Sequence, residues 1–110
     1  MALSVVLRET PKQPLLIVSS DMNHFADVIT THRLDELALK AIATRDPEYV
    51  YETVRQNRIS MCGMAPCVVA MEALRWMGCL TRCEAVGRAT SADAGGPVDR
   101  VVGYAGMLFG

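Results

Sequence analysis

The feature that most constrains the fold is a continuous apolar run, Leu15-Leu16-Ile17-Val18, preceded by Pro14 and followed by Ser19-Ser20-Asp21. A strand without polar alternation is apolar on both faces, which is typical of a parallel sheet covered on both sides. Open sheets of this kind bind ligands beyond the carboxyl ends of their strands. The run therefore predicts a buried strand over residues 15–19, with a ligand site among the polar residues that follow it.

Helical spacing and turn residues divide the rest of the chain. Asp46 before Pro47 is a favourable helix start, because aspartate caps a helix and proline suits its first position. Gly78 is placed to end another helix. The predicted elements are the end of a helix at residues 5–7, helices over 30–42, 46–58 and 66–77, and strands over 80–87 and 100–109. Three strands need helices on both faces, so we predict an α/β fold, a three-layer sandwich with a mostly parallel sheet flanked by helices.

The composition is unusually apolar for the length of the chain. Apolar residues make up 51% and charged residues 21% of 110 residues, which is room for a single domain, 1–110. A domain of this size buries only a little over ~60% of its unfolded surface. Leaving even ~800 Å² of apolar surface in water would forfeit ~20 kcal/mol at ~25 cal/mol per Å². We therefore expect a homo-oligomer, or association with a complementary half of a larger fold.

Charge and cysteine usage exclude several classes of protein. The net charge is −1, so the chain lacks the basic surface that nucleic acid or an anionic membrane requires. No apolar run approaches the ~20 residues of a membrane span, and the first residues do not resemble a secretory leader. The spacing of the four cysteines matches neither a zinc ribbon nor a C-x-x-C motif. We expect reduced thiols and a cytoplasmic location.

Three side chains are candidates for chemistry. Asp21 and His24 lie three positions apart after the predicted strand, and Cys62 comes just before a predicted helix. A carboxylate beside an imidazole suits metal ligation or general acid–base work, and a thiol at a helix start favours metal binding or nucleophilicity. The plainer alternatives are a helix cap for Asp21, an exposed ring for His24 and a small buried side chain for Cys62. We predict that the three side chains converge at the end of the 15–19 strand.

Other polar features are weaker. His32 lies near a helix start without a partner at a useful spacing, so we expect it at the surface. A cysteine-protease pairing of Cys62 with His24 has no distinctive motif in support. The Gly95-Gly96-Pro97 loop lacks the lysine and the following helix of a phosphate-binding loop.

Three blocks of the sequence resemble the Memo-like family. Residues 15–25 (LLIVSSDMNHF) are similar to its ISSDMSHY block, and residues 59–63 (ISMCG) followed by Pro66 are similar to its ISMCGxxP block. The end of the chain, TSAD at 90–93 and VVGYA at 101–105, resembles its TSGD…VVGYAA ending. The resemblance covers nearly all of residues 14–109 and corresponds to the C-terminal part of a Memo-like domain.

The resemblance implies a fold, a metal and partners. The fold implied is that of class III extradiol dioxygenases, of which the chain would form a partial domain. Family members bind copper or iron, with zinc less favoured, through two N-terminal histidines and the cysteine that matches Cys62; the positions of Asp21 and His24 line the same pocket. Members also occur with an AMMECR1-like protein and a radical-SAM protein, as the AmmeMemoRadiSam system.

These implications leave several functions open. The first is a metal-dependent oxidoreductase or metal-handling protein, with Cys62 and His24 as ligands and His24 with Asp21 in catalysis. A thiolate ligand favours redox or metal handling over ring cleavage. The alternatives are a non-enzymatic peptide- or protein-binding module, and an inactive truncated fragment. With at most three ligands, we expect the isolated chain to hold a metal weakly.

Overall fold

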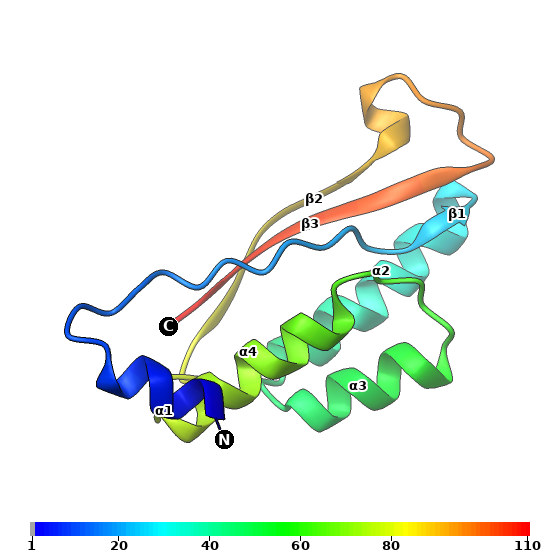
Figure 1. Cartoon of the computed structure of the whole chain (residues 1–110). Helices are drawn as coiled ribbons and strands as arrows, with labels where there is room; N and C mark the ends of the chain where they lie inside the picture. Colours follow the sequence, from blue (N-terminus) through cyan, green and yellow to red (C-terminus); the bar gives the residue numbers. More distant parts are fainter. Residues whose placement is uncertain (1) are drawn as a thin grey trace.

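The computed structural model describes residues 2–110, which form four α-helices, one 3-10 helix and three strands (Figure 1). In chain order the elements are α1 (Ala2–Glu9), β1 (His24–Ala26), α2 (Val28–Ala43), α3 (Pro47–Gln56), α4 (Met64–Trp76), β2 (Cys83–Thr90), η1 (Ser91–Ala94) and β3 (Val101–Phe109). The α/β class predicted from the sequence is confirmed. Among the described residues, none of the helices has the length and apolar character needed to cross a bilayer.

Helix ends follow the local sequence closely. Asp46 caps α3 as predicted, because its carboxylate accepts the backbone N–H groups of Glu48 and Tyr49 at 3.0 and 3.3 Å. Gly78 follows α4 with a φ of +71°, a conformation that suits glycine. Helix α2 begins at Val28, two residues before the predicted start at residue 30, and Asp27 is its N-cap. The Asp27 carboxylate accepts the Thr30 N–H at 2.7 Å. Hydrogen bonding to the side chain of Thr30, and then to its backbone, lowers the pKa of Asp27.

The sheet differs from the prediction. Its order is β1-β3-β2, and both pairs are antiparallel, so the expectation of a mostly parallel sheet is wrong for the described residues. The link between β2 and β3 is too short for the crossover that parallel strands need, whereas it suits an antiparallel return. The long β2–β3 pair spans Cys83↔Phe109 to Thr90↔Gly103.

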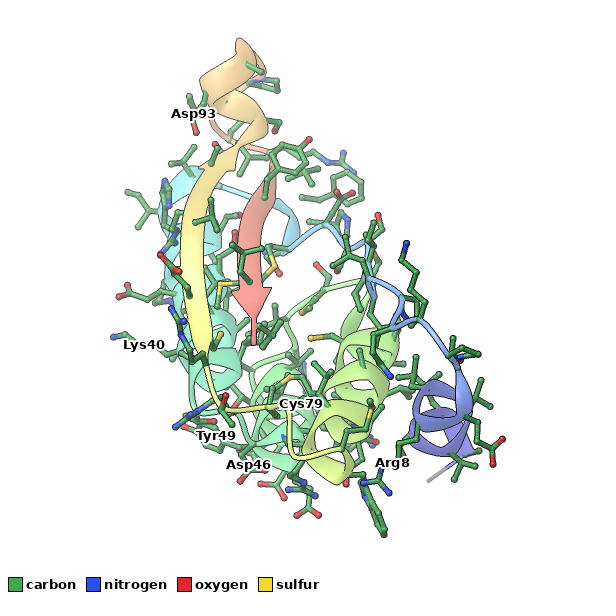
Figure 2. All side chains as sticks on the ribbon, turned by 90° about the vertical axis from the view of Figure 1, so that its left-hand side faces the viewer. Arg8, Lys40, Asp46, Tyr49, Cys79 and Asp93 are labelled. Carbon is green, nitrogen blue, oxygen red and sulfur yellow. The ribbon has the colours of Figure 1, made fainter. Side chains whose placement is uncertain are left out.

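The predicted buried strand over residues 15–19 is not part of this sheet. The segment is extended but carries no strand pairing, and Leu15 and Ile17 are 83% and 80% exposed. It runs beside β3, on the side away from β2 (Figures 1 and 2). Leu16 and Val18 are partly covered by other described residues, at 36% and 38% exposed, whereas Leu15 and Ile17 are largely uncovered.

The core lies between the helices and the inner face of the sheet. Met71 of α4, Val50 of α3 and Ala38 of α2 are almost completely buried. Cys67 belongs to the same cluster, as its helical spacing predicts. On β3, Tyr104 and Leu108 alternate with half-buried neighbours and are 43% and 61% exposed. The described helices therefore cover one face of the sheet, and the third layer of the predicted sandwich is not among the described residues.

Candidate metal centre

Asp21, His24 and Cys62 come together where the segment before β1 meets the loop before α4. Asp21 precedes β1, His24 is its first residue, and Cys62 lies two residues before α4. One ligand atom from each side chain lies within 4.8 Å of the other two. Residues more than 35 positions apart in the chain thus form one cluster, at the place that the sequence predicts.

The ring of His24 is held from its Nδ1 side. Nδ1 contacts the backbone carbonyl of Ser60, which can only accept a hydrogen bond, so Nδ1 carries a proton and donates it. The His24 N–H also donates to the Ser60 hydroxyl at 2.8 Å. Only Nε2 remains available for a metal or for general acid–base work. Metal-binding histidines are commonly oriented in this way by a carbonyl on the other ring nitrogen.

The remaining nitrogen faces a carboxylate. Nε2 of His24 lies 3.5 Å from Oδ2 of Asp21, and the Asp21 side chain is 50% exposed. In the neutral ring with Nδ1 protonated, Nε2 and the carboxylate are both acceptors, and two facing acceptors repel each other. A cation between them, either a proton on Nε2 or a metal ion, removes the repulsion. The donor set therefore fits a metal ion.

The thiol of Cys62 is exposed and lies against the segment that carries Asp21. The Asp21 backbone N–H points at Sγ over 3.4 Å, and the Ser20 hydroxyl lies 3.8 Å from it. The same hydroxyl accepts the Gly63 N–H at 2.8 Å. These contacts join the two loops directly beneath the cluster.

Gly63 makes this close approach feasible. A Cβ at position 63 would lie 2.3 Å from Cβ of Ser20 and 2.8 Å from the Ser19 carbonyl oxygen. Real side chains do not tolerate such distances, so any larger residue would push the loops apart. The glycine that follows Cys62 is thus explained by the contact between the loops.

The geometry argues against a nucleophilic cysteine–histidine pair. Such a pair needs one ring nitrogen for the thiol and the other for an orienting group. Here Ser60 can serve as the orienting group on Nδ1, but Nε2 faces the Asp21 carboxylate and, within residues 2–110, forms no hydrogen bond with the Cys62 thiol. A metal site of mixed sulfur, nitrogen and oxygen ligands uses the same atoms without this conflict.

The other candidate residues lie outside the cluster. His32 is exposed, as predicted, and its backbone carbonyl accepts a hydrogen bond from Arg88 at 2.7 Å. Cys67 is buried, which raises the pKa of its thiol to about 11. Burial also raises the pKa of Cys83. Cys79 lies in the turn that joins α4 to β2 (Figure 2). All four cysteines are free thiols, in agreement with the sequence analysis.

Three residues around the cluster were not predicted as site residues. Ser60 accepts a hydrogen bond from the His24 ring, and Asn23 accepts one from Ser60. Asp35 of α2 accepts one from the backbone of Asn23. One signal in the sequence does mark Asp35. It lies between Leu34 and Ala38, on the face of the helix that carries the apolar side chains, where an acidic residue is unusual.

An apolar cavity of about 140 Å³ adjoins the cluster. Val18, Ser20 and Met22 line one side of it, and Met107 and Phe109 of β3 are among the residues on the other. The cavity shares Ser20 with the loop contact at Cys62, but none of the three ligand residues lines it.

Comparison with known proteins identifies relatives over nearly the whole chain. Residues 1–108 match the family described as Memo-like protein. The chain is 34% identical over 107 residues to a MEMO1 family protein of Aquifex aeolicus, covering 97% of this chain and 39% of the relative. It is 38% identical over 104 residues to one of Archaeoglobus fulgidus, covering 93% and 38% of the two chains. A relative from Aeropyrum pernix is 41% identical over 90 residues, which is 82% of this chain and 31% of the relative. The chain thus spans less than two-fifths of the length of these relatives.

Proposed function

Since the chain belongs to the Memo-like family, we propose that it supplies one side of a transition-metal centre, held by Cys62, His24 and Asp21. The observation that carries the proposal is the close approach of three ligand atoms, two of which face each other as acceptors. A thiolate with an imidazole suits copper or iron better than the hard cations. We favour zinc less than copper or iron as the metal of this centre.

Each of the three side chains has a separate role in the proposed centre. Cys62 supplies a soft sulfur ligand, and His24 supplies Nε2 because Ser60 holds Nδ1. Asp21 supplies an oxygen, and beside His24 it is placed to accept a proton from a bound molecule. A bound copper or iron would supply electron transfer or Lewis acidity. We propose metal or redox handling as the function of the centre; an oxygen-uptake assay with catechols separates this function from ring cleavage.

We further propose that a second polypeptide completes the centre. Three ligands leave a transition metal with open positions, and the relatives are more than twice as long as this chain. The exposed Leu15 and Ile17 support a partner that covers the segment before β1. We favour the complementary part of a Memo-like domain as this partner, and a second copy of the chain is the alternative.

Metal titration tests the proposed centre. We expect Co²⁺ or Cu⁺ to bind in one equivalent, with weak affinity, and to give a thiolate-to-metal absorption band. Cys62→Ser should abolish the band, whereas Cys79→Ser, which removes another exposed thiol, should leave it unchanged. His24→Gln should weaken binding, and His32→Gln is its matched control. A band that survives Cys62→Ser, or the absence of binding to the unmodified chain, would contradict the proposal.

A further inference from the structure

The inference concerns Asp35, a buried carboxylate on α2. Asp35 is only 2% exposed, and no described residue forms an ion pair with it. Its Oδ1 accepts the backbone N–H of Asn23 at 2.8 Å. Burying a carboxylate without a cationic partner is costly. This cost indicates that Asp35 has a role other than filling space in the core.

A chain of hydrogen bonds leads from Asp35 to the ring of His24. Asn23, whose backbone Asp35 holds, uses its side-chain Oδ1 to accept both the N–H and the hydroxyl of Ser60, each at 3.1 Å. Ser60 in turn accepts from Nδ1 of His24 through its carbonyl and from the His24 N–H through its hydroxyl. Two residues, Asn23 and Ser60, therefore connect the carboxylate on the helix to the ring nitrogen of the candidate ligand.

Asp35 also contacts the strand that crosses this network. A Cβ at Gly103 would lie 1.8 Å from Oδ2 of Asp35, so the carboxylate occupies the space that any other residue would fill. The backbone of Gly103 accepts the Met22 N–H and donates to the Asn23 carbonyl, both at 2.8 Å. Asp35 thus packs against the point where β3 is joined to the segment that carries the cluster.

We propose that Asp35 is a positioning residue that fixes the orientation and tautomer of His24. Its hydrogen bond to the Asn23 N–H keeps Ser60 in place, so that the Ser60 carbonyl accepts a hydrogen bond from Nδ1 of His24. Nε2 then faces Asp21 and Cys62. The importance of this role for metal binding rests on the proposed function, whereas its effect on the tautomer of His24 is independent of any metal.

Nuclear magnetic resonance of the histidine ring nitrogens tests the proposal directly. At a pH where the rings are neutral, we expect His24 of the unmodified chain to carry its proton on Nδ1. Asp35→Ala and Asn23→Ala should both raise the fraction with the proton on Nε2. Asp35→Asn keeps an acceptor oxygen for Asn23 and should largely restore the original tautomer.

Thr31→Val is the matched control for these variants. Thr31 lies one turn before Asp35 on α2, is fully buried, and its hydroxyl has no hydrogen-bond partner within residues 2–110. Its replacement removes a buried oxygen from the same helix without touching the network, so the His24 tautomer should not change. If Asp35→Ala fails to fold, Asn23→Ala interrupts the same path at the next residue.

Metal affinity gives a second measurement. Outer hydrogen-bond partners of a metal ligand typically contribute ~10–100-fold to affinity. Asp35→Ala acts through Asn23 and Ser60, so it should weaken Co²⁺ binding by at most this factor, and Thr31→Val should not weaken it. A folded Asp35→Ala or Asn23→Ala variant with the tautomer of the unmodified chain would overturn the positioning role. A changed tautomer in a chain that binds no metal would instead contradict only the proposed function.

Discussion

Two adjacent stretches of the chain, residues 14–19 and 20–24, are held in very different ways. Within residues 2–110, no backbone–backbone hydrogen bond joins residues 14–19 to another segment, and Leu15 and Ile17 are exposed. In residues 20–24, Met22 and Asn23 bond to Gly103, and His24 bonds to Ser60. The polar stretch is therefore fixed, while the apolar stretch beside it lacks a partner. The comparison shows that this chain holds the cluster through its own contacts, whereas the described residues leave Leu15 and Ile17 exposed.

The largest expected effect is a loss of stability from a substitution that disturbs residues 20–24. Gly63→Ala would place a methyl group 2.3 Å from Cβ of Ser20, so the loops that carry Cys62 and Asp21 must separate. Overpacking of this kind costs ~1–3 kcal/mol, and we expect a loss of this size in the free energy of unfolding measured in urea. Gly87→Ala is the control, because a Cβ there meets nothing within 4 Å; it should change stability by less than ~0.5 kcal/mol. Equal effects of the two substitutions would contradict the close contact.

The next effect is on association, through a substitution in the exposed apolar stretch, residues 14–19. Ile17→Asp changes a side chain that is 80% exposed, so the stability of the monomer should change by less than ~0.5 kcal/mol. Association should weaken at least ~10-fold, because burying an isoleucine contributes ~1.5–3 kcal/mol and a buried charge opposes binding. Sedimentation at micromolar concentrations, alone and with the complementary part of a Memo-like domain, measures this effect.

Val6→Asp provides the comparison for that experiment. Val6 is 60% exposed on α1 and lies outside the uncovered stretch, so its replacement should leave association unchanged. A well-folded unmodified chain that remains monomeric under both conditions would contradict the predicted association. Equal weakening by Val6→Asp and Ile17→Asp would place the interface elsewhere.

The smallest effect is a pH dependence that originates next to the fixed stretch. Burial raises the pKa of Asp35 above its ordinary value of 3.8, against the opposing influence of the Asn23 hydrogen bond and of Arg88, His32 and His24. The unfolded chain therefore loses this proton at lower pH than the folded chain does. Stability should fall as the pH rises from ~4 through the folded-state pKa.

Asp35→Asn removes this ionisation while retaining an acceptor for Asn23. In urea unfolding at a series of pH values, the variant should lack the part of the decline that Asp35 contributes. Asp99→Asn changes an exposed carboxylate and should leave the decline in place. A decline that persists unchanged in Asp35→Asn would show that the carboxylate is already ionised in the folded chain at the bottom of this range.

Local signals in the sequence predicted much of the secondary structure. Asp46 and Pro47 start α3, and Gly78 follows α4, because capping and φ preferences act over a few neighbouring residues. Asp21, His24 and Cys62 were predicted together because two short motifs carry them. Their convergence in the structure agrees with this prediction, while their chemical roles remain proposals.

Non-local interactions account for the rest. The apolar run at residues 15–18 predicts a buried strand, but its apolar pattern does not specify a pairing partner, and the described residues leave Leu15 and Ile17 exposed. The antiparallel order follows from the pairing of β3 with both β1 and β2, which the apolar pattern alone does not specify. Phe25 has a φ of +62° within β1, a conformation that no propensity favours for phenylalanine. Asp35 acquires its role only when α2 packs against Gly103.

The exposed apolar run at residues 15–18 makes the rate of partner binding compete with the rate of self-association. Leu15-Leu16-Ile17-Val18 is a short uncharged stretch of apolar residues, and within residues 2–110 no backbone–backbone hydrogen bond pairs it. These are features that segments of cross-β fibrils share. Capture by a partner in fixed supply depends on the first power of the concentration of this chain, whereas stacking with its own copies depends on a higher power. If a partner covers this stretch as proposed, dilution would favour the assembled protein, and overproduction without the partner would favour the fibril.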